Sequence, residues 1–534
     1  SRQFATFLNL VSEGEIEGFA TASKEGRTQG TSAYSNAAKK DIFLDNTPIL
    51  QSNASSTNPR KVDFNHKDVN FDVRFGTGNQ SKMKGLKGSA SAFNVGVEVK
   101  KGNANAITRQ LTNNPEIDAV RVTVTVPTLQ KMEEDGDIIG SKITLEIQVQ
   151  NNGGGFVTKV TDTIKGRTAD AYNRDYRINV GTNHPIDIRV KKTSDDSTDR
   201  ISRDLIWSSY SELIDDRNKY LNSAYTKLRF DSEFFTRIPN RKFRIRGIKV
   251  RIPGAGANSS GTPTVDLATG RIKYPNGYIF NGVMGAAVWT SCPAMVLLDL
   301  LTTSRYGFGD HITDSSLDLF SFVNASKFAN TLVDDGAGGQ EARFSCNVNI
   351  QSPKEAFDLI NELAGVMRCM PIWSAGSITI TQDKPTDASY LFNLSNVGEG
   401  GFSYAGSSLK TRHSVISVSY YNMDSQEVDF EVVEDAAIKS KIGTVVKQVK
   451  AFACTSRGQA RRLGKAILFA ENNESEVCTF TTSIDSGIVV RPGAVIEIQD
   501  PVRAGVRRGG RLKTVTSTTV VTVDDTNATD LPTD

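Results

Sequence analysis

The residues of this chain that could do chemistry do not form a catalytic or metal-binding pattern. The acidic, glycine-rich segment DDGAGGQE at 334–341 misses the spacing of a calcium loop, and carboxylate pairs such as Glu133 and Glu134 are common on polar surfaces. The motifs HExxH, GxSxG, Walker A and GxGxxG after a strand are absent from the sequence. The histidines are scattered in four different local contexts: His66, His184, His311 and His413. We therefore expect no catalytic residue, no metal and no cofactor, and we interpret the protein as not an enzyme.

A basic stretch offers the best candidate for contact with a partner. In FRIRGIKVRIP, at 243–253, the two-residue period of a strand places Phe243 and Ile245 on one face. Arg244 and Arg246 then share the other face, and Lys242 extends the basic row. Guanidinium groups in a row repel one another unless solvent or acidic groups screen them. The row is either a solvated strand face or a contact with a neighbouring subunit or with the contents of a lumen.

Charge and cysteine usage narrow the class of protein. The 63 lysines and arginines nearly balance the 60 aspartates and glutamates, so a net charge of +3 indicates neither a strongly basic nor a strongly acidic partner. The five cysteines lack a CxxC pair and are typical of buried thiols in a reducing compartment. No run approaches about 18 apolar residues, and the N-terminus lacks a basic-then-apolar export signal.

The predicted secondary structure changes from strands to helices near Trp289. Before this point the chain consists of strands and polar turns, and after it helices appear. The segment CPAMVLLDLL predicts a mostly buried helix with Cys292 as N-cap and Pro293 in the first turn. Gly307 and Gly309 in the following RYGFG allow a sharp turn without interference from a Cβ atom.

Three further helices are predicted after this turn. The first covers 314–330, with Leu317, Phe320 and Phe328 facing inward. The other two begin with capping boxes, formed by Ser352 with Glu355 and by Ser456 with Gln459. RFSCNVNI at 343–350 and the paired segments MRCMPIW and SITIT are predicted strands, so Asp310 to about Thr386 is expected to form a compact α/β unit.

The region 56–204 is expected to be an inserted β-domain. Its segments, such as AVRVTVTV and KITLEIQVQ, alternate between apolar and polar residues, and Asn151-Asn152-Gly153 predicts a turn between two strands. Short strands at regular spacing are typical of a β-sandwich. Near the N-terminus, DIFLDNTPIL predicts a hairpin with its turn at Asp45-Asn46.

Segments along nearly the whole chain resemble a known family. The chain is similar to tip attachment protein J of lambda-like long-tailed bacteriophages. The resemblance lies in SEGEIEGF (12–19), LIWSSYSELID (205–215), the helix ending in RYGFG, MRCMPIW (367–373), TQDKPTD (381–387), VVED (432–435), AFACTSRGQARR (451–462) and PGAVIEIQD (492–500).

The resemblance implies a fold that is mainly β with α+β parts. It implies a first tube-like β-barrel hub domain at 1–55 plus 205–288 and the inserted β-sandwich-like domain at 56–204. An α/β hub unit at 289–386 and a second tube-like β-barrel with one helix at 387–534 follow. Composition and periodicity by themselves predict only a β-rich, then mixed, then β-rich order.

The resemblance also implies a function and partners. The chain is expected to be a structural hub at the tail tip of the virion, which closes the tail tube, anchors the tape-measure protein and opens for DNA ejection. It would be assembled in the host cytoplasm as a homotrimer with distal tail and tail tube proteins and with other tip proteins and fibres. DNA would be present only in transit, and the host surface would be bound by regions further C-terminal.

Two other classes of function remain open at this stage. Some tail hubs carry domains that degrade the cell wall, and a β-rich adhesin would bind a receptor directly. The absence of catalytic signatures disfavours the first, and the long hub-like match disfavours the second. Because the chain begins without methionine and ends in a polar stretch, DDTNATDLPTD, we also expect the natural product to continue beyond Asp534.

Overall fold

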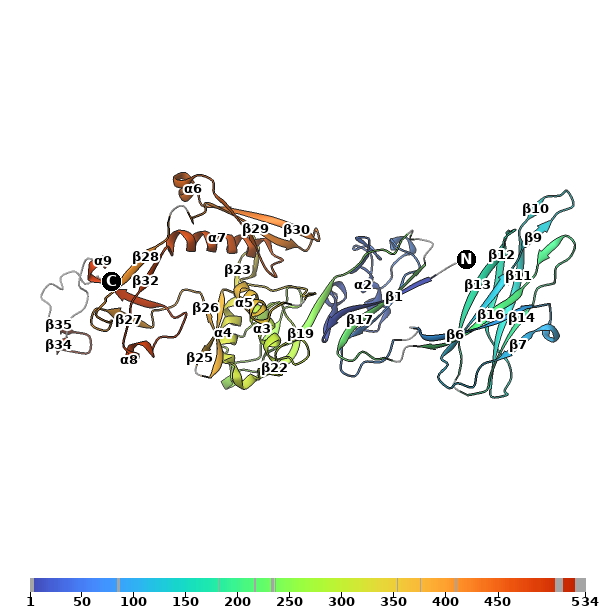
Figure 1. The fold of residues 1–534 in the computed structure, drawn as a ribbon, viewed down its shortest axis with the longest axis horizontal. Coiled ribbons are helices and arrows are strands. Elements are labelled where there is room, and N and C mark those ends of the chain that lie inside the picture. The colour runs from blue at the N-terminus through green and yellow to red at the C-terminus, as the bar shows by residue number, and fades with distance from the viewer. Residues whose placement is uncertain are drawn as a thin grey trace. The chain divides into compact units, whose positions relative to one another are not determined.

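A computed structural model shows two compact units, Ser1–Ile248 and Lys249–Asp534 (Figure 1). It describes residues 4–83, 87–181, 183–215, 218–231, 235, 237–352, 354–374, 376–408, 411–504 and 512–523. Strands outweigh helices, as the expected mainly β fold with α+β parts requires. The polar tail that suggested a longer natural chain lies outside the described residues. No helix among those described is both long enough and apolar enough to cross a membrane.

The first part of the N-terminal unit brings together segments from both ends of its sequence. An antiparallel sheet has the order β1 (Phe4–Glu13), β17 (Ser223–Asp231), β5 (Asn70–Phe75). A second sheet contains β18 (Arg241–Phe243), β3 (Ile42–Leu44) and β4 (Thr47–Pro48). The β3–β4 turn has positive φ at Asp45 and Asn46, which confirms the predicted hairpin. Two helices, α1 (Ala20–Lys24) and α2 (Ser32–Lys39), complete a core that includes Phe19, Leu228 and Phe230.

The second part of the N-terminal unit is a β-sandwich. One sheet has the order β12 (Val157–Gly166), β11 (Ser141–Asn151), β14 (Ile186–Lys192), β7 (Ile107–Gln110). The other has the order β13 (Tyr172–Asn179), β8 (Ala119–Val126), β16 (Ile206–Asp215), β6 (Lys87–Glu98). A small extension contains β10 (Ile138–Ile139), β9 (Leu129–Met132) and β15 (Ile201–Arg203).

The sandwich core follows the alternation seen in the sequence. Val120, Val122 and Val124 of β8 are buried, and the residues between them are more exposed. Trp207 of β16 is also fully buried in this core. The sandwich strands run from 87 to 215, whereas the sequence suggested an insert at 56–204. Because β16 pairs with β8 and β6, LIWSSYSELID is a sandwich strand.

One strand belongs to both units. In β19 (Ile245–Pro253), residues up to Ile248 pair with β2 (Ile16–Phe19) of the N-terminal unit. From Lys249 onward the strand pairs with β22 (Met284–Trp289) of the C-terminal unit.

The C-terminal unit opens with the predicted buried helix. Helix α3 (Pro293–Thr302) has Cys292 as N-cap and Pro293 in its first turn, as expected. It contacts α4 (Leu319–Ala329) and α5 (Ala356–Val366). The strands of this part are β20 (Thr264–Val265), β21 (Ile272–Lys273), β23 (Leu332–Asp334), β24 (Gln340–Ala342), β25 (Cys369–Ser374) and β26 (Ser377–Gln382).

Several local predictions for this part were wrong. The expected helix at 314–330 is a single 3-10 turn at Asp314–Ser316 followed by α4, because the Asp318 side chain caps the helix at the Ser321 N–H. Phe320 is more than half exposed, not inward-facing. Helix α5 starts after Glu355, so Ser352 is not its N-cap. RFSCNVNI is not a strand, because Phe344 and Cys346 bond to Ala329 and Ser291 outside any sheet ladder.

The last part of the chain is β-rich with a long helix. Its central sheet has the order β30 (Glu427–Glu434), β29 (Val415–Asn422), β31 (Val446–Lys450), and α7 (Arg457–Asn473) packs on one face of it (Figure 1). The other strand pairs are β27 (Tyr390–Asn393) with β33 (Ile496–Gln499), β28 (Ser403–Gly406) with β32 (Glu476–Thr479), and β34 (Leu512–Val515) with β35 (Val521–Val523). The short helices are α6 (Ala436–Ile442), α8 (Ile484–Gly487) and α9 (Pro501–Ala504).

The sheets in the described residues are open and have two to four strands. The two barrels that the resemblance implies therefore stay a prediction. Open sheets leave strand edges with free backbone hydrogen-bonding groups, and such edges are natural places for another chain to join.

Candidate functional site

The predicted basic row is interrupted at Arg244. Strand β18 ends at Phe243 and β19 begins at Ile245, so Arg244 lies between two strands. The backbone N–H of Arg244 donates to the carbonyl oxygen of Asp41 at 2.9 Å. Lys242, Arg244 and Arg246 therefore do not form one continuous face.

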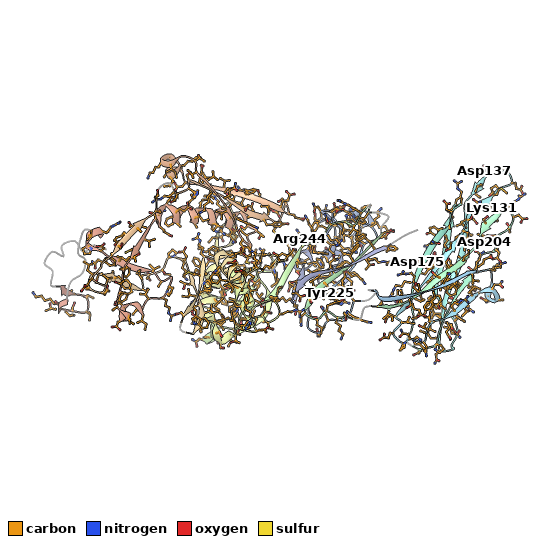
Figure 2. All side chains as sticks on the ribbon, viewed as in Figure 1. Lys131, Asp137, Asp175, Asp204, Tyr225 and Arg244 are labelled. Carbon is orange, nitrogen blue, oxygen red and sulfur yellow. The ribbon has the colours of Figure 1, made fainter. Side chains whose placement is uncertain are left out.

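Arg244, labelled in Figure 2, is held by a buried carboxylate in its own unit. Its guanidinium Nε donates to Asp41 Oδ1 at 2.8 Å, and a second guanidinium nitrogen lies 2.8 Å from the same oxygen. Asp41 also accepts from the N–H and the hydroxyl of Thr21. Burial raises the pKa of Asp41, and the contacts from Thr21 and Arg244 partly offset that shift. This cluster joins α1 to the residue before β3 and to the residue between β18 and β19.

Arg246 and Lys242 lie in opposite environments. Arg246 is only 5% exposed, and its backbone pairs with Gly18 of β2. Burial lowers the pKa of its guanidinium, and the carboxylates of Glu17 and Asp41 oppose the shift. Lys242 is exposed. Carboxylates of the same unit thus balance much of the charge of Arg244 and Arg246. A contact of the basic residues with another subunit or with a lumen stays a prediction.

The glycine of the SEGEIEGF motif has a packing role at this place. Gly18 has a φ of +129°, and a Cβ atom there would meet the hydroxyl of Tyr34. That hydroxyl lies 3.2 Å from the Phe19 backbone N–H, from which it accepts a hydrogen bond. The motif therefore shapes the strand that faces Arg246.

An open polar groove lies at the β9–β10 end of the sandwich, near the labelled Lys131 and Asp137 in Figure 2. Its charged side chains pair locally, because Lys131 Nζ lies 2.7 Å from Glu133 and Arg200 lies 3.2 Å from Glu134. In the described parts of the chain, no three histidine, cysteine or acidic residues are grouped so that they could hold a metal ion.

The sheet β30–β29–β31 has an exposed apolar face that the sequence did not predict. On the sheet β30–β29–β31, the face opposite α7 carries large apolar side chains that are 42–63% exposed. They come from all three strands: Tyr421, Val428, Phe430, Val432 and Val446. We call this set the apolar sheet face. The alternation of acidic and apolar residues in EVDFEVVE predicts its strand, but which face is covered depends on where α7 lies.

The opposite face of the same sheet is covered by α7. Ile416, Val418 and Val433 are buried beneath the helix. Glu471 of α7 accepts from Lys447 of β31 at 2.7 Å and lies 2.9 Å from His413 Nδ1. Burial would raise the pKa of Glu471, but these hydrogen bonds and charges outweigh it and hold the pKa below its ordinary value.

The expected capping box at the start of α7 is half present. The Ser456 hydroxyl accepts from the Gln459 N–H at 3.1 Å. The Gln459 side-chain amide does not return to the helix start. Its oxygen accepts from the Ser345 N–H and hydroxyl, and its nitrogen donates to the Ser345 carbonyl at 3.1 Å. The side chain thereby fixes α7 against the segment that follows β24.

Comparisons with known proteins match two regions to family models. Residues 89–216 match the FNIII-A domain of tip attachment protein J, and residues 355–512 match a family described as putative phage tail protein. The first match begins inside β6 and ends one residue after β16, so it covers the strands of both sandwich sheets.

Two curated relatives are both called tip attachment protein J. The protein of Escherichia phage SECphi27 is 29% identical over 86% of this chain and 37% of its own length. That of Escherichia phage SECphi4 is 29% identical over 99% of this chain and 43% of its own length. The chain thus spans less than half the length of these relatives.

Two solved structures show a distant likeness to this chain. A 43 kDa tail protein of prophage MuSo2 from Shewanella oneidensis is 12% identical, with a TM-score of 0.24 over 74% of this chain and 89% of that chain. A xylan-binding domain from Paenibacillus barcinonensis Xyn10C is 12% identical, with a TM-score of 0.15 over 28% of this chain and 85% of that chain. Neither is close enough to carry an argument. The family and relative matches confirm the resemblance seen in the motifs: the chain is similar to tip attachment protein J of tailed phages.

Proposed function

We propose that this chain is a structural hub of the tail tip, where copies of it surround the end of the tail tube. The observation that supports the proposal most is the match to tip attachment protein J along 99% of this chain. The mainly β architecture with open sheets is also suited to assembly, because free edges and exposed apolar faces are available for neighbouring proteins.

The hub would close the tube, hold the end of the tape-measure protein and open to let DNA leave. Copies of the chain would form a homotrimer around the tail axis, since three chains with two β-rich blocks each offer six similar surfaces to a sixfold tube ring. Its neighbours would be tail tube, distal tail and other tip proteins. Host recognition would lie in parts of the natural protein outside this chain.

Labelling of virions tests this role directly. Gold-conjugated antibodies raised against residues 411–504 are expected to bind at the tail end distal to the capsid. Binding along the tail shaft, or on the capsid, would exclude the hub role. The two other classes make different predictions for the purified chain: hydrolysis of peptidoglycan would favour a wall-degrading enzyme, and saturable binding to host cells would favour an adhesin.

A further inference from the structure

The two edges of the sheet β30–β29–β31 carry opposite charges. Strand β30 contains four carboxylates and no basic residue: Glu427, Asp429, Glu431 and Glu434. Strand β31, with the sequence VKQVK, contains Lys447 and Lys450 and no acidic residue. In the part of the chain that the structure describes, each of these strands pairs with β29 alone. Their outer backbone edges are therefore open to another strand.

We propose that copies of this chain associate edge to edge, with β31 of one copy adding to β30 of the next. The occupant of each edge is thus a second copy, whose matching edge this same sheet provides. The inference rests on the proposed function in one respect, which is that copies of the chain meet around one axis.

Charge decides between the possible pairings of the edges. Two β30 strands side by side would set four carboxylates against four, and two β31 strands would set lysines against lysines. Like charges on paired strands are destabilising, whereas opposite charges favour association. Some of the charges are already balanced within the chain, because Glu431 pairs with Arg457, Glu434 with Lys439 and Lys447 with Glu471. Glu427 and Lys450 have no ion pair within the described residues, but they lie on opposite faces of the sheet. The join therefore brings together the net charges of two edges and does not pair these two side chains.

The strand directions within the sheet make β31 of one copy antiparallel to β30 of the next. Strand β31 runs parallel to β29, and β30 runs antiparallel to it. A copy related by rotation about an axis along the strands keeps the direction of its β29. Its β30 therefore runs antiparallel to the β31 that it meets. Such a head-to-tail contact uses different surfaces on each side, so it closes into a ring when the rotation fits.

The same join would extend the apolar sheet face from one copy to the next. Phe430 and Val432 of one copy would lie on the same side of the combined sheet as Val446 and Gln448 of the next. Cross-strand pairs of aromatic and β-branched side chains stabilise a sheet and remove apolar surface from water. This explains why β30, an edge strand, presents apolar side chains on the side that α7 leaves uncovered.

Paired cysteines test the join in the full chain. Phe430→Cys and Gln448→Cys are introduced singly and together in a Cys478→Ser background, because the other four cysteines are buried. Within one chain these two positions are separated by β29, at about 10 Å, which is too far for a disulfide. Mild oxidation is therefore expected to leave both single variants monomeric and to convert the double variant into covalent multimers. Val428→Cys and Val432→Cys with Gln448→Cys cover the neighbouring registers.

Each result of this experiment decides the question. Dimers from either single variant would show the like-with-like pairing that the charges oppose, and would overturn the inference. Absence of multimers from all three double variants, in solution and in assembled tails, would overturn it too. A trimer at the tail tip without these cross-links would contradict the edge join but not the hub role, and cross-linked multimers with no copies at the tip would contradict the hub role alone.

A charge reversal provides the matched control. In the double-cysteine variant, Lys450→Glu is expected to lower the multimer yield about three- to tenfold, because it places a negative charge on the edge that meets the four carboxylates of β30. Lys441→Glu, on the exposed side of α6, makes the same change in net charge away from the edge and is expected to leave the yield unchanged. An equal loss in both variants would show that only net charge matters, and would overturn the edge join.

Discussion

Arg244 was predicted to be a contact residue because of its charge, but in the structure it forms an ion pair with buried Asp41. The two side chains are 203 residues apart in sequence, and Asp41 has no exposed surface. Strand periodicity indicates which residues alternate, but it contains no information about a carboxylate so distant. The candidate contact residues were therefore identifiable from the sequence, while their partners were not.

Replacement of Arg244 by serine is expected to destabilise the N-terminal unit. The buried Asp41 carboxylate would lose its charged donor, at a cost of about 2 kcal/mol in free energy of unfolding. Lys242→Ser removes an exposed charge nearby and is expected to change stability by less than about 0.5 kcal/mol. Urea unfolding, followed by hydrogen exchange of peptides from this unit, compares the two. An Arg244→Ser variant that is fully stable yet fails to assemble would support the intersubunit role instead.

Glu471 gives the C-terminal unit a predictable dependence on pH. Its pKa is lower in the folded protein than its ordinary value of 4.5, so the ionised form contributes stability above that pH. The contribution is lost as pH falls through the folded-state pKa. Glu471→Gln is expected to cost about 1 kcal/mol at pH 7 and clearly less at pH 3.

The control for this pH prediction is Glu399→Gln. Glu399 is exposed and has no ion pair in the described part of the chain, so its replacement is expected to leave stability unchanged at both pH values. Denaturant midpoints of the C-terminal unit at pH 7 and pH 3 provide the measurement. A Glu471→Gln defect of equal size at both pH values would rule out the ion pair as its cause.

At the scale of elements, local signals in the sequence were reliable where the structure depends on local geometry. The first turn of α3, the Asp45-Asn46 hairpin and the glycine turn after α3 were all predicted from neighbouring residues. The errors arose where tertiary contacts replaced a local motif. Gln459 bonds to Ser345 and not to its own helix start, and the strand expected at RFSCNVNI is instead held by isolated bonds to other segments.

The glycine turn after α3 provides an element-scale prediction. A Cβ atom at position 307 would overlap the Leu300 carbonyl oxygen, which accepts from the Phe308 N–H at 2.9 Å. Gly307→Ala is therefore expected to cost about 2 kcal/mol. Gly365→Ala, inside α5 with open space around the new methyl group, is expected to stabilise by about 0.5–1 kcal/mol.

Urea midpoints of the C-terminal unit compare these two glycine variants on one scale. Equal stability of the Gly307→Ala variant and the parent protein would mean that the turn can move away from Leu300. The close approach of backbone at RYGFG would then have no role in fixing the end of α3.

At the scale of the whole molecule, the order of β-rich, mixed and β-rich regions was predictable, and the extent of the sandwich was not. Alternating patterns predicted its strands, but no local pattern shows that LIWSSYSELID joins β8 and β6 in one sheet. The resemblance to a protein family could also be predicted, because it rests on short motifs spread along the chain. Those motifs indicate similarity to tip attachment protein J, whereas the surfaces proposed for assembly could be identified only from the folded sheets.

We propose that copies of this chain form the hub at the end of the tail. A density map of the intact tail tip, computed without imposed symmetry, tests it most directly. We predict three copies around the tail axis, placed at the mouth of the tube, with β31 of each copy beside β30 of the next. A map with one copy or six copies of this chain, or with none at the tip, would rule out the trimeric hub.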